Sequence, residues 1–156
     1  MRFILFTSIL IFFDQISKIC IKFYLYNQQL NIIGSFLKFT YIENRGIAFG
    51  IDTSNYHIYV TILSILVIIY IIYYYNIHYK EYSLYQKTSF SFLIGGALGN
   101  IIDRILVLIP NSGYSGVIDF IDIGFNSYRW YIFNFADIFI TIGIMIYLIS
   151  EYKLDK

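Results

Sequence analysis

Hydrophobic residues form four long runs along the chain, and shorter polar segments separate these runs. The second run contains "IYVTILSILVIIYIIYYY", which has no charged residue. A helix of ~20 mostly apolar residues is long enough to cross the ~30 Å hydrocarbon core of a bilayer. The pattern therefore predicts a single membrane domain over residues 1–156, with transmembrane helices at about residues 3–26, 56–76, 88–109 and 131–149.

The composition agrees with this pattern, since 58% of the 156 residues are hydrophobic and 13% are charged. A soluble domain is closer to half apolar and a quarter charged, so we interpret the chain as an integral membrane protein. The formal net charge of +1 gives no indication of a nucleic-acid partner. The single cysteine, Cys20, cannot form an intramolecular disulfide.

Basic residues indicate which side of the membrane each segment faces. The terminal segments and the short connection between the second and third runs carry Arg2, Lys80, Lys87, Lys153 and Lys156. By the positive-inside rule, both termini lie in the cytoplasm. The segments 27–55 and 110–130 then lie outside, and their irregular patterns predict short strands or structure at the membrane surface.

Charged residues follow one face of the first run. Asp14, Lys18 and Lys22 are spaced i, i+4 and i+8, which places them on the same side of a helix. Asp14 is expected to pair with Lys18. The lysines are expected to extend toward the outer surface while their methylene stems stay in apolar surroundings.

Small and polar residues interrupt the third run. The stretch from Gly95 to Gly99 contains GxxxG, which lets another helix approach closely. Asn100, Asp103 and Arg104 follow on one face, at i, i+3 and i+4. Two interpretations of Asp103 and Arg104 remain open: an ion pair that holds helices together, or a direct chemical role.

The fourth run begins with two more polar residues, Asn134 and Asp137, at i and i+3. With a rise of ~1.5 Å per residue, these residues, Asp14 and the polar face of the third run all reach the outer half of the membrane. Inserting a charge at membrane depth costs at least ~2.5 kcal/mol, so such residues mark function or a paired structural site. Asp137 has no basic partner on its own helix, which favours a functional role.

Elimination leaves carboxylate chemistry. The chain has two histidines, both at the ends of the second run, and it lacks the HExxH motif of zinc hydrolases. No metal and no cofactor is expected. Two neighbouring carboxyl groups supply one protonated acid and one base, as in aspartic proteases. Asp137 could pair with Asp119 or with Asp122, and spacing alone does not choose between them.

Five short blocks, in order along nearly the whole chain, carry a family resemblance: "DQISK", "NRGIAFG", "GGALGNIIDR", "GVIDF" and "FNFAD". Together they resemble the bacterial lipoprotein signal peptidase (signal peptidase II) family. The resemblance implies an all-α membrane protein of four transmembrane helices with a small extracytoplasmic β-like cradle. It also implies an aspartic endopeptidase that cleaves diacylglyceryl-modified prolipoproteins on the amino side of the lipid-modified cysteine, and that is inhibited by globomycin.

The resemblance also assigns roles to residues. It implies that Asp119 and Asp137 are the catalytic pair. Residues that position the substrate backbone, the lipid head or the pair are expected at Asp14, Asn44, Asn100, Asp103, Arg104 and Asn134. Lys18 and Gly46 are expected among the substrate-binding or supporting residues. The segment from Ile105 to Ile118 is longer than is usual in the family. The implied setting is the bacterial cytoplasmic (inner) membrane, where a monomer would act among membrane lipids with its active site toward the outer face.

Two other classes of function are compatible with buried polar residues. One is a small proton-coupled transporter or channel subunit, because intramembrane Asp, Asn and Arg also serve as relays. The other is a non-catalytic scaffold whose polar residues lock the helices together. The stretch "IFITIGIMIYLI" after Asp137 is apolar, which favours a site open to the outer side over a path through the membrane.

Overall fold

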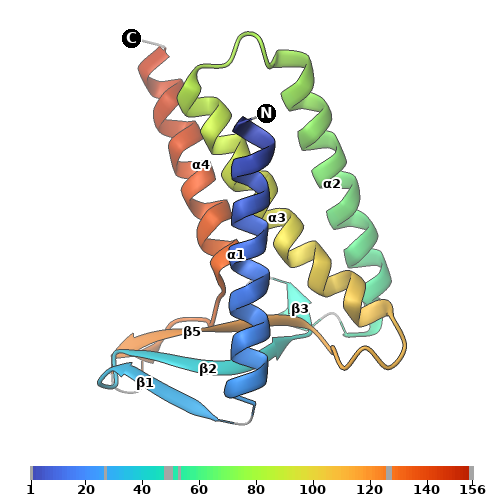
Figure 1. The fold of residues 1–156 in the computed structure, drawn as a ribbon, viewed down its shortest axis with the longest axis vertical. Helices are drawn as coiled ribbons and strands as arrows, with labels where there is room; N and C mark the ends of the chain where they lie inside the picture. Colours follow the sequence, from blue (N-terminus) through green and yellow to red (C-terminus); the bar gives the residue numbers. More distant parts are fainter. Residues whose placement is uncertain (1, 27, 48–50, 53, 126–127, 155–156) are drawn as a thin grey trace.

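The computed structural model describes residues 2–26, 28–47, 51–52, 54–125 and 128–154. Within these residues, four helices are long and apolar enough to cross a membrane: α1 (Arg2–Tyr24), α2 (His57–His78), α3 (Leu84–Leu108) and α4 (Phe135–Leu154). The prediction of four spans is confirmed. α1 begins and α4 ends on the same side of the molecule, and a small sheet closes the opposite end (Figure 1).

The observed helix ends differ from the predicted ones where side chains cap the backbone. α3 begins four residues before the predicted Thr88, because Ser83 and Gln86 form a capping box. The Ser83 hydroxyl accepts from the Gln86 N–H at 3.3 Å, and the Gln86 side chain accepts from the Ser83 N–H at 2.8 Å. These bonds satisfy backbone donors that have no partner within the helix.

Antiparallel strands form the closing sheet, as the outer segments predicted. Its order is β1 (Gln29–Ile33), β2 (Leu37–Asn44), β5 (Val117–Phe125) and β6 (Tyr128–Arg129). A separate pair consists of β3 (Gly46–Ile47) and β4 (Ile51–Asp52), and the short 3-10 helix η2 (Ser54–Tyr56) leads into α2. The register pairs Ile42 of β2 with Asp119 of β5. The expected β-like cradle is therefore present.

Glycines allow α3 to pack closely against its neighbours. A Cβ at Gly95 would lie 3.0 Å from the Leu10 Cβ, and a Cβ at Gly99 would lie 2.5 Å from an Asp14 carboxylate oxygen. This confirms the packing role predicted for the GxxxG stretch. α3 runs obliquely between α4 and α2 (Figure 1), so its glycine face meets α1 and α4 while its other side meets α2.

Two apolar clusters fix the parts of the fold that carry the site. One joins α2 and α3 through Ile68, Tyr75, Phe90, Ile94 and Ile101. The other packs the C-terminal end of α1 against β5, through Ile21, Ile118, Phe120 and Ile121. β5 is buried from Val117 to Asp122, so its polar residues occupy fixed positions beneath the helix ends.

Candidate active site

The start of α4 explains the polar residues in the fourth apolar run. The Asn134 side-chain oxygen accepts from the Asp137 N–H at 3.0 Å, and an Asp137 carboxylate oxygen accepts from the Asn134 N–H at 3.1 Å. The two residues thus form a reciprocal cap, in which Asn134 precedes the helix. The predicted span starting at Tyr131 was therefore too long at this end. The cap also places the Asp137 carboxylate at the positive end of a helix dipole.

A second carboxylate supports the same helix end. Asp14, which is fully buried in α1, accepts from the Ala136 N–H at 2.9 Å. Ala136 lies in the first turn of α4, where backbone donors have no intrahelical partner. Asp14 therefore ties α1 to the start of α4, next to Asp137.

Asp119 extends from β5 toward these residues and is 4% exposed. Its two carboxylate oxygens accept from the side-chain amides of Asn134 at 2.6 Å and Asn44 at 2.9 Å. The Asn44 oxygen in turn accepts from the Gly46 N–H at 2.9 Å, which fixes the orientation of that amide. Burial, and after it the nearby Asp137 carboxylate, raises the pKa of Asp119 to about 7.

The structure separates the two aspartates between which spacing did not choose. Asp122 forms an ion pair with Arg129, with a distance of 2.6 Å between the Arg129 Nε and a carboxylate oxygen. Its backbone carbonyl accepts from the same guanidinium at 3.1 Å. Residues three apart on a strand face opposite sides, so Asp119 faces the helices while Asp122 is held beside β6.

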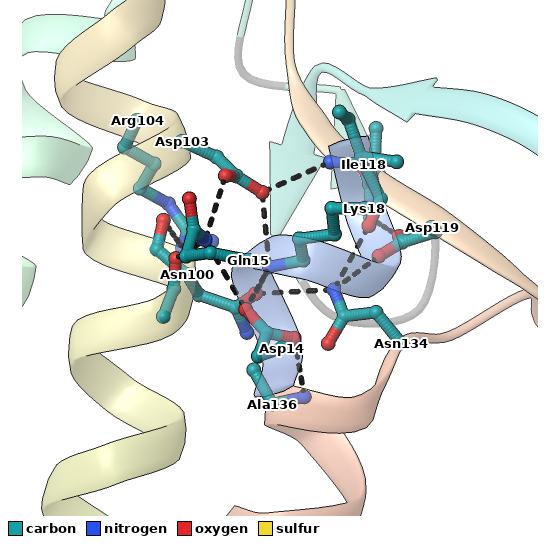
Figure 2. Close-up of polar contacts among 12 residues, drawn as sticks. Asp14, Gln15, Lys18, Asn100, Asp103, Arg104, Ile118, Asp119, Asn134 and Ala136 are labelled. Carbon is teal, nitrogen blue, oxygen red and sulfur yellow. Dashed lines mark hydrogen bonds and ion pairs between the residues drawn. The ribbon is translucent and has the colours of Figure 1, made fainter. Parts of the chain in front are cut away.

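A buried charge cluster of Asp14, Lys18 and Asp103 lies close to Asp119 (Figure 2). The Lys18 ammonium is 2.8 Å from Asp14 and 2.9 Å from Asp103, and the Lys18 side chain is 1% exposed. The predicted pairing of Asp14 with Lys18 is confirmed. The expectation that Lys18 extends to the outer surface was wrong, because α3 supplies Asp103 as a second buried anionic partner. Asp103 also accepts from the Ile118 N–H of β5 at 3.2 Å.

Asp103 and Arg104 have separate surroundings although they are neighbours in sequence. Asp103 is directed at Lys18, while the Arg104 guanidinium donates to the Asn100 backbone carbonyl at 3.3 Å. The alternative of an ion pair between Asp103 and Arg104 is wrong, since the pair that joins helices is Asp103 with Lys18. Arg104 instead lines a cleft together with the two aspartates.

This cleft has a volume of about 1090 Å³. Its polar wall includes Asn44, Gly46, Asn100, Arg104, Asp119 and Asp137. Its apolar wall includes Leu63, Val67 and Ile68 from α2 and Ile140 from α4. Carboxylates therefore meet a large apolar surface in one cavity, an arrangement suited to an amphipathic substrate.

The sequence analysis did not identify two residues that support the site, Gln15 and Glu43. Gln15 donates to Asp14 and Asp103, each at 3.2 Å, and to the Gly99 carbonyl at 3.0 Å. Its position beside Asp14 in "DQISK" was an available signal. Glu43 of β2 had no comparable signal, because its partners come from distant parts of the chain.

Glu43 joins α1, β2 and the segment after α3. It accepts from Lys22 at 3.0 Å, from the Ser115 N–H at 2.7 Å, and from the hydroxyls of Tyr41 and Ser115. Lys22 also lies over the Tyr114 ring, 3.6 Å from its centroid. Burial alone would raise the pKa of Glu43, but the hydrogen bonds from Ser115, Tyr41 and Lys22 outweigh it and lower that pKa.

Two carboxylates, Asp119 and Asp137, line the cleft. Among the described residues, no group of three or more His, Cys, Asp and Glu side chains is arranged to hold a metal ion. Asp119 and Asp137 belong to different elements, but both contact Asn134 and both line the cleft. This arrangement is able to provide an acid and a base to a molecule bound there.

Comparisons with known proteins agree with the fold and with the motifs. The family model described as signal peptidase (SPase) II matches residues 6–153. A lipoprotein signal peptidase of Clostridium novyi is 36% identical, with 92% of this chain and 94% of that protein covered. Another, from Staphylococcus aureus, is 34% identical, with 96% and 87% covered. A solved bacterial membrane enzyme superposes with a TM-score of 0.80 at 33% identity, covering 97% of this chain and 88% of that one.

Proposed function

The chain belongs to the signal peptidase II family, and we propose that it removes signal peptides from diacylglyceryl-modified bacterial prolipoproteins. Cleavage falls on the amino side of the lipid-modified cysteine. The observation that carries the proposal is the meeting of Asp119 and Asp137 at one cleft, where Asn134 contacts both carboxylates. The multi-pass fold and the peptidase family agree with this function.

In the proposed reaction, the two aspartates share one proton. Asp119 carries it, because its pKa is raised to about 7 by burial and by the charge on Asp137. Asp137, hydrogen-bonded by Asn100 and by the cap of α4, acts as the base. It takes a proton from water as the water oxygen attacks the scissile carbonyl, while Asp119 protonates the carbonyl oxygen. Collapse of the tetrahedral intermediate returns a proton to Asp119, and the proton on Asp137 goes to the leaving amine.

The shape of the cleft supports a lipid-bearing peptide as the substrate. The peptide bond would lie against Asp119 and Asp137, and the diacylglyceryl chains would follow the apolar wall of Leu63, Val67 and Ile140. Arg104 is available for the polar head of the lipid or for the substrate backbone. Exposed apolar residues on the helices suit a surrounding bilayer, which supplies the lipid-modified substrate laterally.

We further propose that the protein acts as a monomer in the bacterial inner membrane. Basic residues near Arg2, in the connection from α2 to α3 and in the C-terminal tail favour a cytoplasmic location for both termini. The sheet and the cleft would then face outward. Globomycin is expected to occupy the cleft and to block cleavage.

Cleavage of a defined substrate tests the proposal. The purified protein is incubated with a diacylglyceryl prolipoprotein peptide, with and without globomycin, and the products are identified by mass spectrometry. Asp119→Asn and Asp137→Asn should abolish cleavage while the protein still inserts. Asp122→Asn is the matched control, since Asp122 is paired with Arg129 and should not be needed for chemistry. Full activity of Asp137→Asn would refute the assignment.

The transporter alternative has less support. Proton or solute coupling needs polar groups along a path through both halves of the membrane. The carboxylates around the cleft contact β5 and the start of α4 through Ile118, Asn134 and Ala136. The stretch from Ile138 to Ile149 is apolar apart from Thr141, Gly143 and the Tyr147 hydroxyl. A proteoliposome flux assay that gave no proton movement, alongside peptide cleavage, would separate the two functions.

A further inference from the structure

Lys18 is a fully satisfied buried cation. An ammonium group has three N–H donors and no acceptor. Those of Lys18 are directed at Asp14 at 2.8 Å, at Asp103 at 2.9 Å and at the side-chain oxygen of Asn100 at 3.0 Å. Lys18 does not line the cleft, whereas Asn100 does. Lys18 therefore affects a substrate through Asn100 rather than by contact.

The Asn100 amide lies between an obligate donor and an obligate acceptor. Because the Lys18 ammonium can only donate, the Asn100 oxygen must face it. The Asn100 NH₂ group then faces the pair of Asp119 and Asp137, called the dyad below, and donates to an Asp137 carboxylate oxygen at 2.9 Å. The same Asn100 oxygen also accepts from the Asn134 amide at 3.0 Å, and that amide donates to Asp119 at 2.6 Å.

We propose that Lys18 is a positioning residue for the peptidase reaction: it sets the amide orientation of Asn100, and through Asn100 and Asn134 it holds both aspartates in their working geometry. Without the ammonium, the Asn100 oxygen keeps only the Asn134 amide as a donor, so the Asn100 amide is held less firmly in the orientation that donates to Asp137. This inference rests on the proposed function, because it describes how the same aspartates are held. A displacement of ~1 Å at reacting groups costs about 100-fold in rate.

Lys18 has a second, separable effect through its charge. The charged groups near the dyad or lining its cleft from the surrounding elements are Asp14 and Lys18 of α1, Glu43 and Arg45 at the end of β2, and Asp103 and Arg104 of α3. α2 contributes Leu63, Ser64, Val67 and Ile68 to the cleft, and none of these four residues is charged. Loss of the Lys18 cation favours the protonated dyad, so the acid limb of the rate profile should move to higher pH.

Two variants separate orientation from charge. Lys18→Met removes the donor and the cation; the double variant Lys18→Met with Asp103→Asn removes the donor but keeps the net charge of the cluster. Both should lose about 100-fold in kcat with KM close to that of the unsubstituted protein. The acid limb should shift in the single variant and return in the double variant. Lys18→Gln, which keeps an N–H donor without charge, should recover part of kcat.

Lys22→Met is the matched control, because Lys22 lies one turn further along the same face of α1 and contacts Glu43 instead of Asn100. It should keep kcat. Wild-type kcat in Lys18→Met, or full recovery of kcat in the double variant, would overturn the proposal. If the unsubstituted protein fails to cleave the diacylglyceryl peptide, the proposed function fails instead, so the two failures are distinguishable.

A measurement on the unsubstituted protein covers the case in which Lys18 variants do not fold. Side-chain amide NMR signals of ¹⁵N-labelled asparagine are followed in detergent while the dyad is titrated, with Asn100→Ala used for assignment. The Asn100 amide protons should shift as Asp137 changes its interaction with them. An Asn100 signal that stays constant across the titration would refute the proposed coupling.

Discussion

Replacing Asp119 with asparagine should change how the stability of the protein depends on pH. The pKa of Asp119 is raised from 3.8 to about 7 in the folded protein, by burial and by the charge on Asp137. Between these two values the folded state binds a proton that the unfolded state does not bind. Folding stability contributed by this carboxyl is therefore fully present below pH 3.8 and is lost as pH rises to about 7.

The size of the effect follows from the width of this interval. Each pH unit corresponds to about 1.4 kcal/mol, so the unsubstituted protein loses about 2 kcal/mol between pH 5 and pH 7, and about 3 kcal/mol by pH 8, through this group alone. Asparagine does not titrate. The stability of Asp119→Asn relative to the unsubstituted protein should thus be about 3 kcal/mol more favourable at pH 8 than at pH 5.

Thermal unfolding in detergent, followed by circular dichroism, measures this difference. For a chain of this size, 3 kcal/mol corresponds to a relative shift in Tm of roughly 6–12 °C. Asparagine has one acceptor oxygen, so the hydrogen bond from either Asn44 or Asn134 is lost, but that cost is the same at both pH values. Asp122→Asn is the control, because it removes a buried carboxylate of the same strand that does not line the cleft. A constant offset between Asp119→Asn and the unsubstituted protein would refute the reasoning.

Two further predictions concern the helices that hold the dyad. Gly99→Ala should lower stability by ~1–3 kcal/mol, because the new Cβ would lie 2.5 Å from an Asp14 carboxylate oxygen. At an unhindered helix position, alanine is instead more stable than glycine by about 1 kcal/mol. A higher Tm for Gly99→Ala would therefore show that the predicted steric clash is absent. Ser83→Ala and Asn134→Ala should each cost ~1 kcal/mol as lost helix caps. Ser83→Ala should keep peptide cleavage and Asn134→Ala should lose it. Equal cleavage activity in the two variants would show that Asn134 is not needed to hold Asp119 and Asp137.

Much of the membrane fold could be predicted from sequence, because the bilayer imposes a length and an apolar pattern on each span. The helix ends were less predictable. Hydropathy extends the fourth span to Tyr131, but the chain becomes helical at Phe135, where Asn134 and Asp137 provide a cap. The third span begins at Leu84 for the same reason, and the Ser83 capping box was a local signal that hydropathy does not report.

The site was predictable as a set of residue types and less so as a set of contacts. The one-face spacing of Asp14 and Lys18 predicted their pairing, but the burial of Lys18 depends on Asp103, which lies 85 positions further along the chain. Proximity in sequence misled for Asp103 and Arg104, since helix geometry directs the first at Lys18 and the second into the cleft. Spacing left Asp119 and Asp122 open and the family resemblance implied Asp119; the physical difference between them, which spacing did not show, is that Asp119 lines the cleft while Asp122 is paired with Arg129.

The Glu43 contacts have a consequence for how this protein tolerates change in evolution. The segment between α3 and β5 is attached to Glu43 through Ser115, immediately before the strand that carries Asp119. Residues upstream of that attachment, such as Pro110 and Asn111, are exposed. Insertions and deletions there would end at this anchor, so we expect them to leave β5 in place. Loop length in this region should therefore be able to vary while Asp119 keeps its position.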